Sequence, residues 1–367
     1  MSAITAIRAY RHWQPFAEGS YGTSGGSAEG FDAVVVAVDT ASGVTGWGEM
    51  APLGSFYSDA FAAGARAGVA ELAPQLLGMD AAQPRALARR MGALLRGHPY
   101  VRSAIDMACW DAAARERGQP LCEALGGRFG DTVELYRSVP PLAVDDAAGL
   151  ARRLVGSGYR RLQVKVGGDP RVDADRLRAV RDAVGPEVAL VADANGGWTS
   201  AAAIRFAGMT GDVDHALEQP CATLSECRAV RRRCAVPMLL DESIVTLDDL
   251  LAVRSDGIAD GVTIKLSRVG GVTPAALLRD VAVEAGLVVT VEDTGGATID
   301  TAAMVHVSLS TPEPVRGATV DFNAWVTADN ATGMPAPSGG RLAAPPGAGL
   351  GVEVQAGVLG DPFVDAR

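Results

Sequence analysis

Five apolar runs of β-strand character each lead to one polar residue, and this is the most regular pattern in the chain. The polar residues are Lys165, Asp193, Glu218, Asp241 and Lys265. The runs are LQVKVGG (162–168), VALVADAN (188–195), HALEQP (215–220), PMLLDES (237–243) and GVTIKL (261–266). Parallel strands that are buried on both faces and open into a site at their carboxyl ends have this pattern.

Strand-like and helix-like segments alternate through residues 129–325, which predicts one barrel domain. Residues 132–140 are expected to form strand one, the five runs form strands two to six, and residues 288–293 and 318–322 form strands seven and eight. The segments between them carry apolar residues at helical spacing. Eight such units favour a closed parallel α/β barrel over an open sheet. Strands two and six then lie across the axis, so the two lysines face each other with the carboxylates between them.

Residues 1–128 follow a different pattern and predict an α+β domain that precedes the barrel. Residues 4–13 and 31–52 resemble antiparallel strands, and three helical stretches follow them. Two loops, near residues 18–30 and 51–60, are long enough to act as lids over the barrel mouth. The path of the Pro/Gly-rich tail, 326–367, is not specified by its own residues.

Composition agrees with a soluble enzyme of this kind. The chain has 367 residues, a formal charge of −10 and a pI near 5.0, without a basic run, which argues against a nucleic-acid partner. Its five cysteines form no CxxC pair, so buried reduced thiols are expected. We find no apolar signal segment and no membrane-length apolar stretch, so we expect no membrane partner and a cytoplasmic location.

The three carboxylates Asp193, Glu218 and Asp241 favour a Mg²⁺ site. Hard divalent cations prefer oxygen ligands, and one carboxylate from each of three adjacent strands supplies half of an octahedral shell. The alternative is that these acids cap the helices that follow. Three in succession after apolar runs, where an unpaired charge is costly, favour the metal.

Lys165 and Lys265 are candidate acid/base groups. A lysine in an apolar strand is more often an edge residue that reaches water. These two lysines, flanked by valine, isoleucine and leucine on opposing strands, must instead point into the site. Burial and a nearby metal both disfavour the ammonium form, so we expect pKa values lowered toward neutrality.

These residues resemble the enolase superfamily, in its muconate-lactonizing subgroup. The matching strings are QVKVGG, DANGGW, LEQP, LLDES, KLSRVGG and GGATIDTAAMVH in the barrel, and GWGEMAP and AIDMACWDAAARERGQPLCEALGG in the first domain. The resemblance implies a modified TIM barrel, (β/α)₇β, capped by the amino-terminal domain with help from the tail. It also implies Mg²⁺ on the three carboxylates, catalysis by both lysines, and a homo-oligomer.

One position departs from the subgroup pattern, because Gln163 replaces the first lysine of the KxK strand. Lys165 therefore lacks a neighbouring positive charge. Gln163 together with LEQPCATLSE is similar to the branch that acts on proline derivatives, which includes hydroxyproline betaine 2-epimerases and cis-3-hydroxy-L-proline dehydratases. Gln163, Asn195 and Glu242 are expected to support the site.

Residues outside this core bear on the substrate. A cationic ring nitrogen could be met by Asp293 or by the face of Trp325, although Asp293 could equally cap a loop and Trp325 could simply pack under the tail. Thr294 is expected beside Asp293. In the lids, Tyr21, Phe56, Tyr57 and Asp59 are candidates to close over a small substrate.

Three functional hypotheses follow. The first is a Mg²⁺-dependent dehydratase or 2-epimerase of a hydroxyproline, most specifically one that converts cis-3-hydroxy-L-proline to Δ1-pyrroline-2-carboxylate. The second is a racemase or epimerase of a proline betaine, hydroxyproline betaine, N-acylamino acid or dipeptide, which is less favoured because Trp325 is the one evident aromatic wall. The third is a muconate-type cycloisomerase or a non-catalytic relative. The substrate, its stereochemistry, the lysine that serves each enantiomer and the oligomer size stay open.

Overall fold

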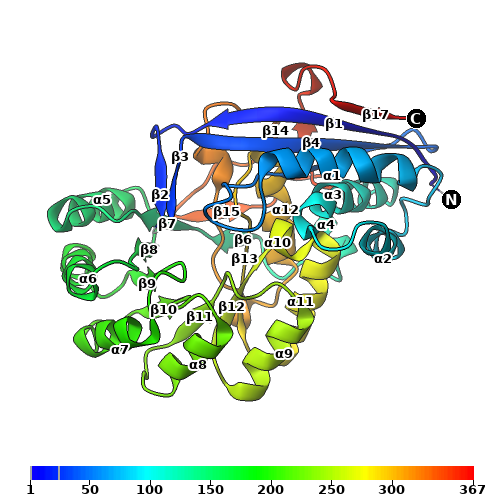
Figure 1. Cartoon of the computed structure of the whole chain (residues 1–367). Helices are drawn as coiled ribbons and strands as arrows, with labels where there is room; N and C mark the ends of the chain where they lie inside the picture. The colour runs from blue at the N-terminus through cyan, green and yellow to red at the C-terminus, as the bar shows by residue number, and fades with distance from the viewer. Residues whose placement is uncertain (1, 24) are drawn as a thin grey trace.

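The computed structural model describes residues 2–23 and 25–367, so residues 1 and 24, the latter within the first predicted lid, lie outside the described residues. The long strands of an amino-terminal domain cross the top of the molecule in Figure 1, above helices on one side and a curved parallel sheet on the other. This mixed α/β architecture confirms the predicted fold class.

The amino-terminal domain is built on an antiparallel four-stranded sheet of order β17-β1-β4-β5. Its strands are β1 (Ile4–Pro15), β4 (Gly30–Thr40), β5 (Thr45–Met50) and, from the tail, β17 (Val364–Ala366). Its helices are α1 (Ala62–Leu72), η1 (Ala73–Leu76), α2 (Pro84–Leu94), α3 (Pro99–Glu116) and α4 (Leu121–Ala124). The first lid contains a small hairpin of β2 (Tyr21–Thr23) and β3 (Gly26–Ala28).

Strand β4 is buried on both faces, which explains why its sequence is almost continuously apolar. Val34, Val36 and Val38 belong to the core formed with α1, α2 and α3. The alternate residues Val35 and Ala37 belong to the second core, which is continuous with the barrel. Full burial of one valine side chain contributes about 1.5–3 kcal/mol to folding. Because β4 has buried residues in both cores, its burial stabilises the contact between the amino-terminal domain and the barrel.

Two glycines let β5 approach α3 closely. A Cβ added to Gly46 would lie 2.1 Å from the carbonyl oxygen of Ala108, and one added to Gly48 would lie 2.0 Å from that of Ala104. Ala104 and Ala108 are one helical turn apart, so α3 presents small side chains and backbone to the strand. The glycines of GWGEM are therefore packing residues.

Gly48→Ala is expected to destabilise the fold by about 1–3 kcal/mol, because overpacking forces the helix and the strand apart. Gly208→Ala is the matched control, since nothing lies within 4 Å of a Cβ at that position in α7 (Ser200–Met209). There, alanine should stabilise the helix by roughly 0.5–1 kcal/mol. Thermal unfolding of both variants checks the opposite signs; equal shifts would refute the close-packing argument.

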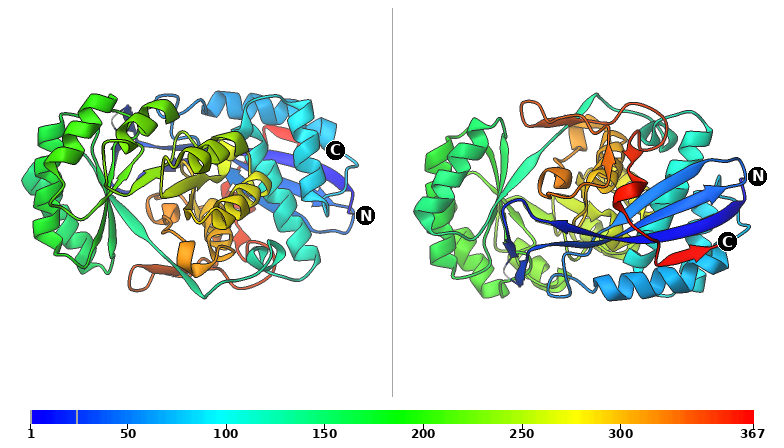
Figure 2. Two further views of the ribbon diagram at one scale, coloured as in Figure 1. Left: turned by 90° about the horizontal axis from the view of Figure 1, so that it is seen from below. Right: turned by 90° about the horizontal axis from the view of Figure 1, so that it is seen from above.

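The barrel domain contains a seven-stranded parallel sheet of order β13-β12-β11-β10-β9-β8-β7. The strands are β7 (Tyr136–Val139), β8 (Arg161–Lys165), β9 (Ala189–Asp193), β10 (Ala216–Glu218), β11 (Met238–Leu240), β12 (Gly261–Lys265) and β13 (Val288–Glu292). The helices are α5 (Val144–Gly156), α6 (Pro170–Val184), α7, α8 (Leu224–Arg231), α9 (Leu247–Asp256), α10 (Leu266–Val269), α11 (Val272–Glu284) and α12 (Thr298–Leu309). Figure 2 shows the green helices on the outside of the curved sheet.

The predicted first and eighth strands differ from the structure. Residues 132–140 divide into β6 (Thr132–Glu134), which pairs with β15 (Arg341–Ala343) of the tail, and β7. The predicted strand at 318–322 is wrong as a strand, because Arg316 and Thr319 form isolated bridges to β13 and to Leu135, and a 3₁₀ turn, η3 (Phe322–Ala324), follows. This segment therefore joins β13 to Leu135 through one bridge on each side, without a continuous ladder of backbone hydrogen bonds.

The tail runs back over both domains. Besides β15 and β17, it forms β14 (Ala331–Thr332) paired with β16 (Glu353–Val354). The remaining short 3₁₀ turns are η2 (Glu313–Val315) and η4 (Ala356–Val358). Ile7 of β1 is paired with Ala366 of β17, so the two ends of the chain lie together (Figures 1 and 2). Across the described ranges, no helix combines the length and the apolar character needed to cross a membrane.

Candidate active site

Parallel pairing brings the five strand-end residues of the sequence pattern together. Lys165 is paired with Asp193, and Asp193 with Glu218, across β8, β9 and β10. Asp241 directly follows β11, and Lys265 ends β12. Each of the five residues exposes 6% or less of its surface. Buried charges of this kind must be paired, protonated or bound to a metal.

The two lysines are held in ion pairs. Lys165 Nζ lies 2.6 Å from Asp193 Oδ2, and Lys265 Nζ lies 2.9 Å from Asp241 Oδ2 and 2.9 Å from Glu292 Oε1. Burial alone lowers the pKa of each lysine, but the nearby carboxylates outweigh it and raise both pKa values. The prediction of lowered lysine pKa values is therefore wrong for this structure, because the expected metal ligands are the partners of the lysines.

Lys165 and Lys265 are also the two lysines of a chain with 33 lysine and arginine residues in total. Sequence reasoning did not use this signal. Arginine serves every other cationic position, and an arginine cannot be deprotonated in proteins, whereas a lysine can. The restriction of lysine to these two buried positions points to an amine that must exchange a proton.

This composition permits a direct measurement of both amines. In protein labelled with ¹³C at lysine Cε and freed of divalent cations, both side-chain signals are expected to keep their ammonium shifts until the pH exceeds about 10, the ordinary range of lysine. The physical reason is that buried carboxylates raise both pKa values, so the stability from the ion pairs is present below that range and lost above it. Lys165→Arg assigns the signals. A signal that titrates near pH 7 under these conditions would contradict the ion pairs.

The three carboxylates interact strongly with one another. Burial and the charges of Asp193 and Asp241 raise the pKa of Glu218 well above its ordinary value. Glu218 accepts hydrogen bonds from Gln163 Nε2 at 2.9 Å and Thr263 Oγ1 at 3.1 Å, so Gln163 contacts the carboxylate cluster directly. Burial raises the pKa of Asp241, but Arg268, with Nη1 2.5 Å from Asp241 Oδ1, and Lys265 lower it overall.

Within the described residues, no three His, Cys, Asp or Glu side chains are grouped closely enough to form a metal site as they stand. Asp193 and Asp241 contact cations instead. The donor set nevertheless suits Mg²⁺, because it consists of buried carboxylate oxygens whose mutual repulsion a divalent cation would relieve. Asp193, Glu218 and Asp241 are thus the residues able to hold such an ion.

Asn195 connects Asp193 to Glu242. Asn195, in a left-handed backbone conformation with φ 44°, donates from Nδ2 to Asp193 Oδ2 and to Glu242 Oε1, both at 3.0 Å. Burial and the charges of Asp241 and Asp193 raise the pKa of Glu242 to about 7. Asn195 therefore links Glu242 to Asp193 at the edge of the carboxylate cluster.

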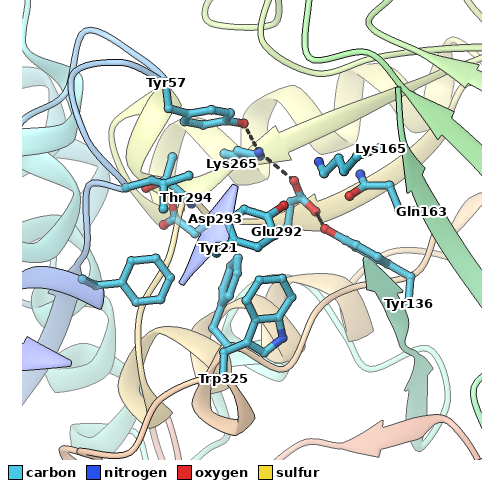
Figure 3. Close-up of a pocket in the computed structure, with 13 residues that line it drawn as sticks. Tyr21, Tyr57, Tyr136, Gln163, Lys165, Lys265, Glu292, Asp293, Thr294 and Trp325 are labelled. Carbon is cyan, nitrogen blue, oxygen red and sulfur yellow. Dashed lines mark hydrogen bonds and ion pairs between the residues drawn. The ribbon is translucent and has the colours of Figure 1, made fainter. Parts of the chain in front are cut away.

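A pocket lies between the barrel mouth and the amino-terminal domain (Figure 3). Thirteen residues line it, and six of them are aromatic: Tyr21, Phe31, Leu53, Tyr57, Tyr136, Gln163, Lys165, Lys265, Glu292, Asp293, Thr294, Phe322 and Trp325. Of the residues predicted to contact the substrate, Tyr21, Tyr57, Asp293, Thr294 and Trp325 line this pocket. The expectation of a single aromatic wall is wrong, because separate segments of the chain contribute rings to one cavity.

Two residues of the second lid do not line this pocket. The Phe56 ring packs against two glycines, with a Cβ at Gly26 or at Gly54 only 2.9 Å or 2.7 Å from it, so Phe56 fastens one lid to the other. Asp59 is exposed. Burial raises the pKa of Tyr100, and the charge of Asp59 adds to that rise. In contrast, Tyr57 reaches the site, accepting a hydrogen bond from Lys265 Nζ and donating to Asp241 Oδ2 at 3.3 Å.

Asp293 lines the pocket wall but its oxygens are occupied. They accept hydrogen bonds from the backbone N–H of Ser267, at 2.9 and 3.1 Å, and from its own neighbour Thr294, at 2.7 Å. Ser267 lies in the first turn of α10, so the capping alternative describes Asp293 better than an ammonium ligand does.

Sequence reasoning missed several polar residues of the site. Glu292, one position before Asp293, pairs in register with Lys265 and points into the pocket. Tyr136 and Arg268 contact Glu292 and Asp241, respectively. Gln219, at φ 34°, accepts hydrogen bonds from the N–H of Asp241 and Ser243. The strand alternation of VVTVED contained the signal for Glu292, since residue parity decides which side chain faces the axis.

The expectation of reduced cysteines agrees with the structure. In the described residues, all five cysteines are free, and four of them are buried. Trp198 is buried and donates to the carbonyl of Gly168, and His306 bonds to backbone groups on both ring nitrogens, so both are structural.

The capped barrel and its strand-end lysines and carboxylates define a member of the enolase superfamily, and the comparisons with known proteins confirm it. The family "Mandelate racemase / muconate lactonizing enzyme, N-terminal domain" matches residues 6–126, and "Enolase C-terminal domain-like" matches residues 146–358. The chain therefore belongs to the enolase superfamily.

Individual relatives are similar to the chain over most of its length. The chain is 41% identical over 360 residues to cis-3-hydroxy-L-proline dehydratase of Roseibium aggregatum, covering 98% of each protein. It is 30% identical over 333 residues to L-Ala-D/L-Glu epimerase of Bacillus subtilis, covering 88% and 89%. It superposes with a TM-score of 0.93, at 37% identity over the full length of both chains, on a superfamily member from Roseovarius nubinhibens ISM crystallised with magnesium.

Proposed function

We propose that this protein is a Mg²⁺-dependent enzyme that removes the proton α to a carboxylate and dehydrates cis-3-hydroxy-L-proline to Δ1-pyrroline-2-carboxylate, with 2-epimerisation as the alternative outcome. The observation that carries the proposal is the placement of the chain's two lysines, buried on β8 and β12 of one curved sheet and lining one pocket. The similarity to a dehydratase of this substrate over 98% of the chain supports the choice of substrate.

Asp193, Glu218 and Asp241 are the proposed Mg²⁺ ligands, and the magnesium-bound relative supports this cofactor. When bound, the ion would stabilise the negative charge that develops on the substrate carboxylate as the α-proton leaves. Asn195 donates to Asp193 and is itself anchored by Glu242, while Gln163 and Thr263 donate to Glu218. These contacts orient the ligands before the substrate arrives.

The two lysines are proposed to divide the proton transfers. In cis-3-hydroxy-L-proline the hydroxyl shares a ring face with the carboxylate, so the α-proton lies on the opposite face. One lysine takes that proton, and the other gives a proton to the departing hydroxyl, which leaves as water. The resulting enamine becomes the imine by a proton shift. A return of a proton to the α-carbon from the second lysine would instead give the epimer.

The second candidate, epimerisation of a proline betaine, is favoured by one observation. The rings of Tyr21, Tyr57 and Trp325 lie in the pocket wall, with the Tyr21 and Trp325 centroids 5.1 Å apart. Aromatic faces attract a quaternary ammonium. A cytoplasmic location and a homo-oligomer remain predictions of the sequence.

The deciding experiment is ¹H NMR in D₂O with Mg²⁺ and one substrate per tube: cis-3-hydroxy-L-proline, L-proline betaine or 4-hydroxyproline betaine. Loss of the ring signals of the first, with growth of imine signals, is expected. Deuteration of a betaine at the α-carbon without loss of substrate would replace the dehydratase by the epimerase. No change in any tube would overturn both candidates and direct attention to N-acylamino acids and dipeptides.

A further inference from the structure

We propose that Glu292 is the carboxylate that receives the ammonium group of the substrate, and that the pocket therefore selects amino acids with a free N–H over oxygen analogues and betaines. This inference rests on the proposed function, because it names the substrate class of the same site. It assigns a role to an acidic residue that is not among the proposed metal ligands.

Glu292 occupies the centre of the pocket. It is the last residue of β13, exposes 3% of its surface and is paired in register with Lys265. In Figure 3 its carboxylate lies among Lys265, Lys165 and Tyr136, and the rings of Tyr21 and Trp325 lie below it. A ligand in this pocket therefore meets Glu292.

The partners of Glu292 distinguish it from the neighbouring acid. Its oxygens contact Lys265 Nζ at 2.9 Å and the hydroxyl of Tyr136, and both are side-chain groups that can rotate. The oxygens of Asp293 are instead fixed by the backbone N–H of Ser267 and Thr294. Only a carboxylate with movable partners can turn toward an ammonium without breaking backbone structure.

The ammonium group of a zwitterionic substrate needs an acidic partner in this pocket. A hydroxyproline is a zwitterion, and its carboxylate is expected on the side of the lysines and the proposed metal ligands. Its ammonium would then be buried among rings, where an unpaired charge is strongly unfavourable. The acidic residues that line the pocket are Glu292 and Asp293, and Asp293 is occupied. Glu292 thus remains as the acceptor, with hydrogen bonds that a ring N–H can donate and a quaternary nitrogen cannot.

A binding cycle tests this assignment without relying on turnover. L-Proline and (S)-tetrahydrofuran-2-carboxylate have the same ring and carboxylate, but the second carries oxygen where the first carries the ammonium. Calorimetric titrations in Mg²⁺ would compare wild type, Glu292→Gln and Asp293→Asn. Wild type is expected to prefer L-proline by roughly 10- to 100-fold, the range for a charge-assisted hydrogen bond.

Glu292→Gln should abolish that preference and leave the affinity for the oxygen analogue within about 3-fold, because only the charged partner is lost. Asp293→Asn and Tyr136→Phe should both retain the preference, since each leaves the Glu292 carboxylate in place. An unchanged preference in Glu292→Gln, its loss in Asp293→Asn, or no preference in wild type would overturn the assignment. Matching thermal unfolding of the variants confirms that each is folded.

This result is separable from the proposed reaction. If wild type binds L-proline through Glu292 yet dehydrates no hydroxyproline in the NMR assay, the reaction is refuted and the ammonium site stands. If wild type dehydrates cis-3-hydroxy-L-proline while Glu292→Gln keeps its preference for the amine, the ammonium site is refuted and the reaction stands.

Discussion

Replacement of Lys165 by alanine is expected to lower the rate of α-proton removal by about 10²- to 10⁴-fold, the usual contribution of a positioned general acid or base. Lys165 forms its ion pair with Asp193 and lies on the wall of the pocket. No other lysine of the chain is available to replace it except Lys265, which ends a different strand. The rate is measured as substrate loss and as deuterium entry at the α-carbon in D₂O.

Lys165→Arg is the matched control for this variant. Arginine keeps the positive charge beside Asp193 but cannot give up its proton at neutral pH. If Lys165 only balances the charge of Asp193, the arginine variant should keep its activity. If Lys165 transfers a proton, the arginine variant should be as inactive as the alanine variant. Lys265→Ala should also stop turnover, while one of the two alanine variants can still exchange the α-proton of a single enantiomer. Full turnover by either alanine variant would refute the two-lysine mechanism.

Replacement of Glu218 by glutamine is expected to weaken Mg²⁺ binding and turnover by roughly 10²-fold or more, since even residues that only orient metal ligands contribute 10- to 100-fold. The same change should make the metal-free protein more stable at neutral pH. The charges of Asp193 and Asp241 and burial raise the pKa of Glu218, so its ionisation favours the unfolded chain as the pH rises above about 4. Glutamine removes that charge.

Thermal unfolding with and without Mg²⁺ measures both effects. Mg²⁺ at about 100 times its Kd should stabilise wild type by about 2.7 kcal/mol and Glu218→Gln much less. Glu49→Gln is the control, because Glu49 is equally buried but bonds to Gln14 and to the backbone N–H of Ala297 and Asp300. Its Mg²⁺ response should be unchanged. If neither EDTA nor Mg²⁺ changes the stability or the activity of wild type, the proposed role of the metal is refuted.

The sequence revealed most of the polar centre because burial is costly for charges. A lysine or carboxylate that ends an apolar run must have a partner, and Asp193, Glu218 and Asp241 on successive strands have each other and the lysines as neighbours. Parallel pairing then brings them to one end of the sheet. For this reason a one-dimensional pattern identified residues that are far apart in the chain.

The pocket wall was less predictable, because its residues depend on side-chain direction. Asp293 and Glu292 are adjacent, and alternation along β13 places Glu292 toward Lys265, while Asp293 bonds to the first turn of α10. Phe56 and Tyr57 are also adjacent, yet one packs between the lids and the other contacts Lys265. Neighbouring residues of similar type therefore make unrelated contacts.

By itself, the sequence determined the alternation of strands and helices, the strand ends that carry charge and the family to which the chain belongs, because these depend on local periodicity and on the cost of burying polar groups. The tertiary structure alone decided which aromatic rings meet in the pocket, which lid residues line it, and how segment 316–320 closes the barrel. Those features arise from contacts between segments distant in the chain, and such contacts leave no periodic signal in any one segment.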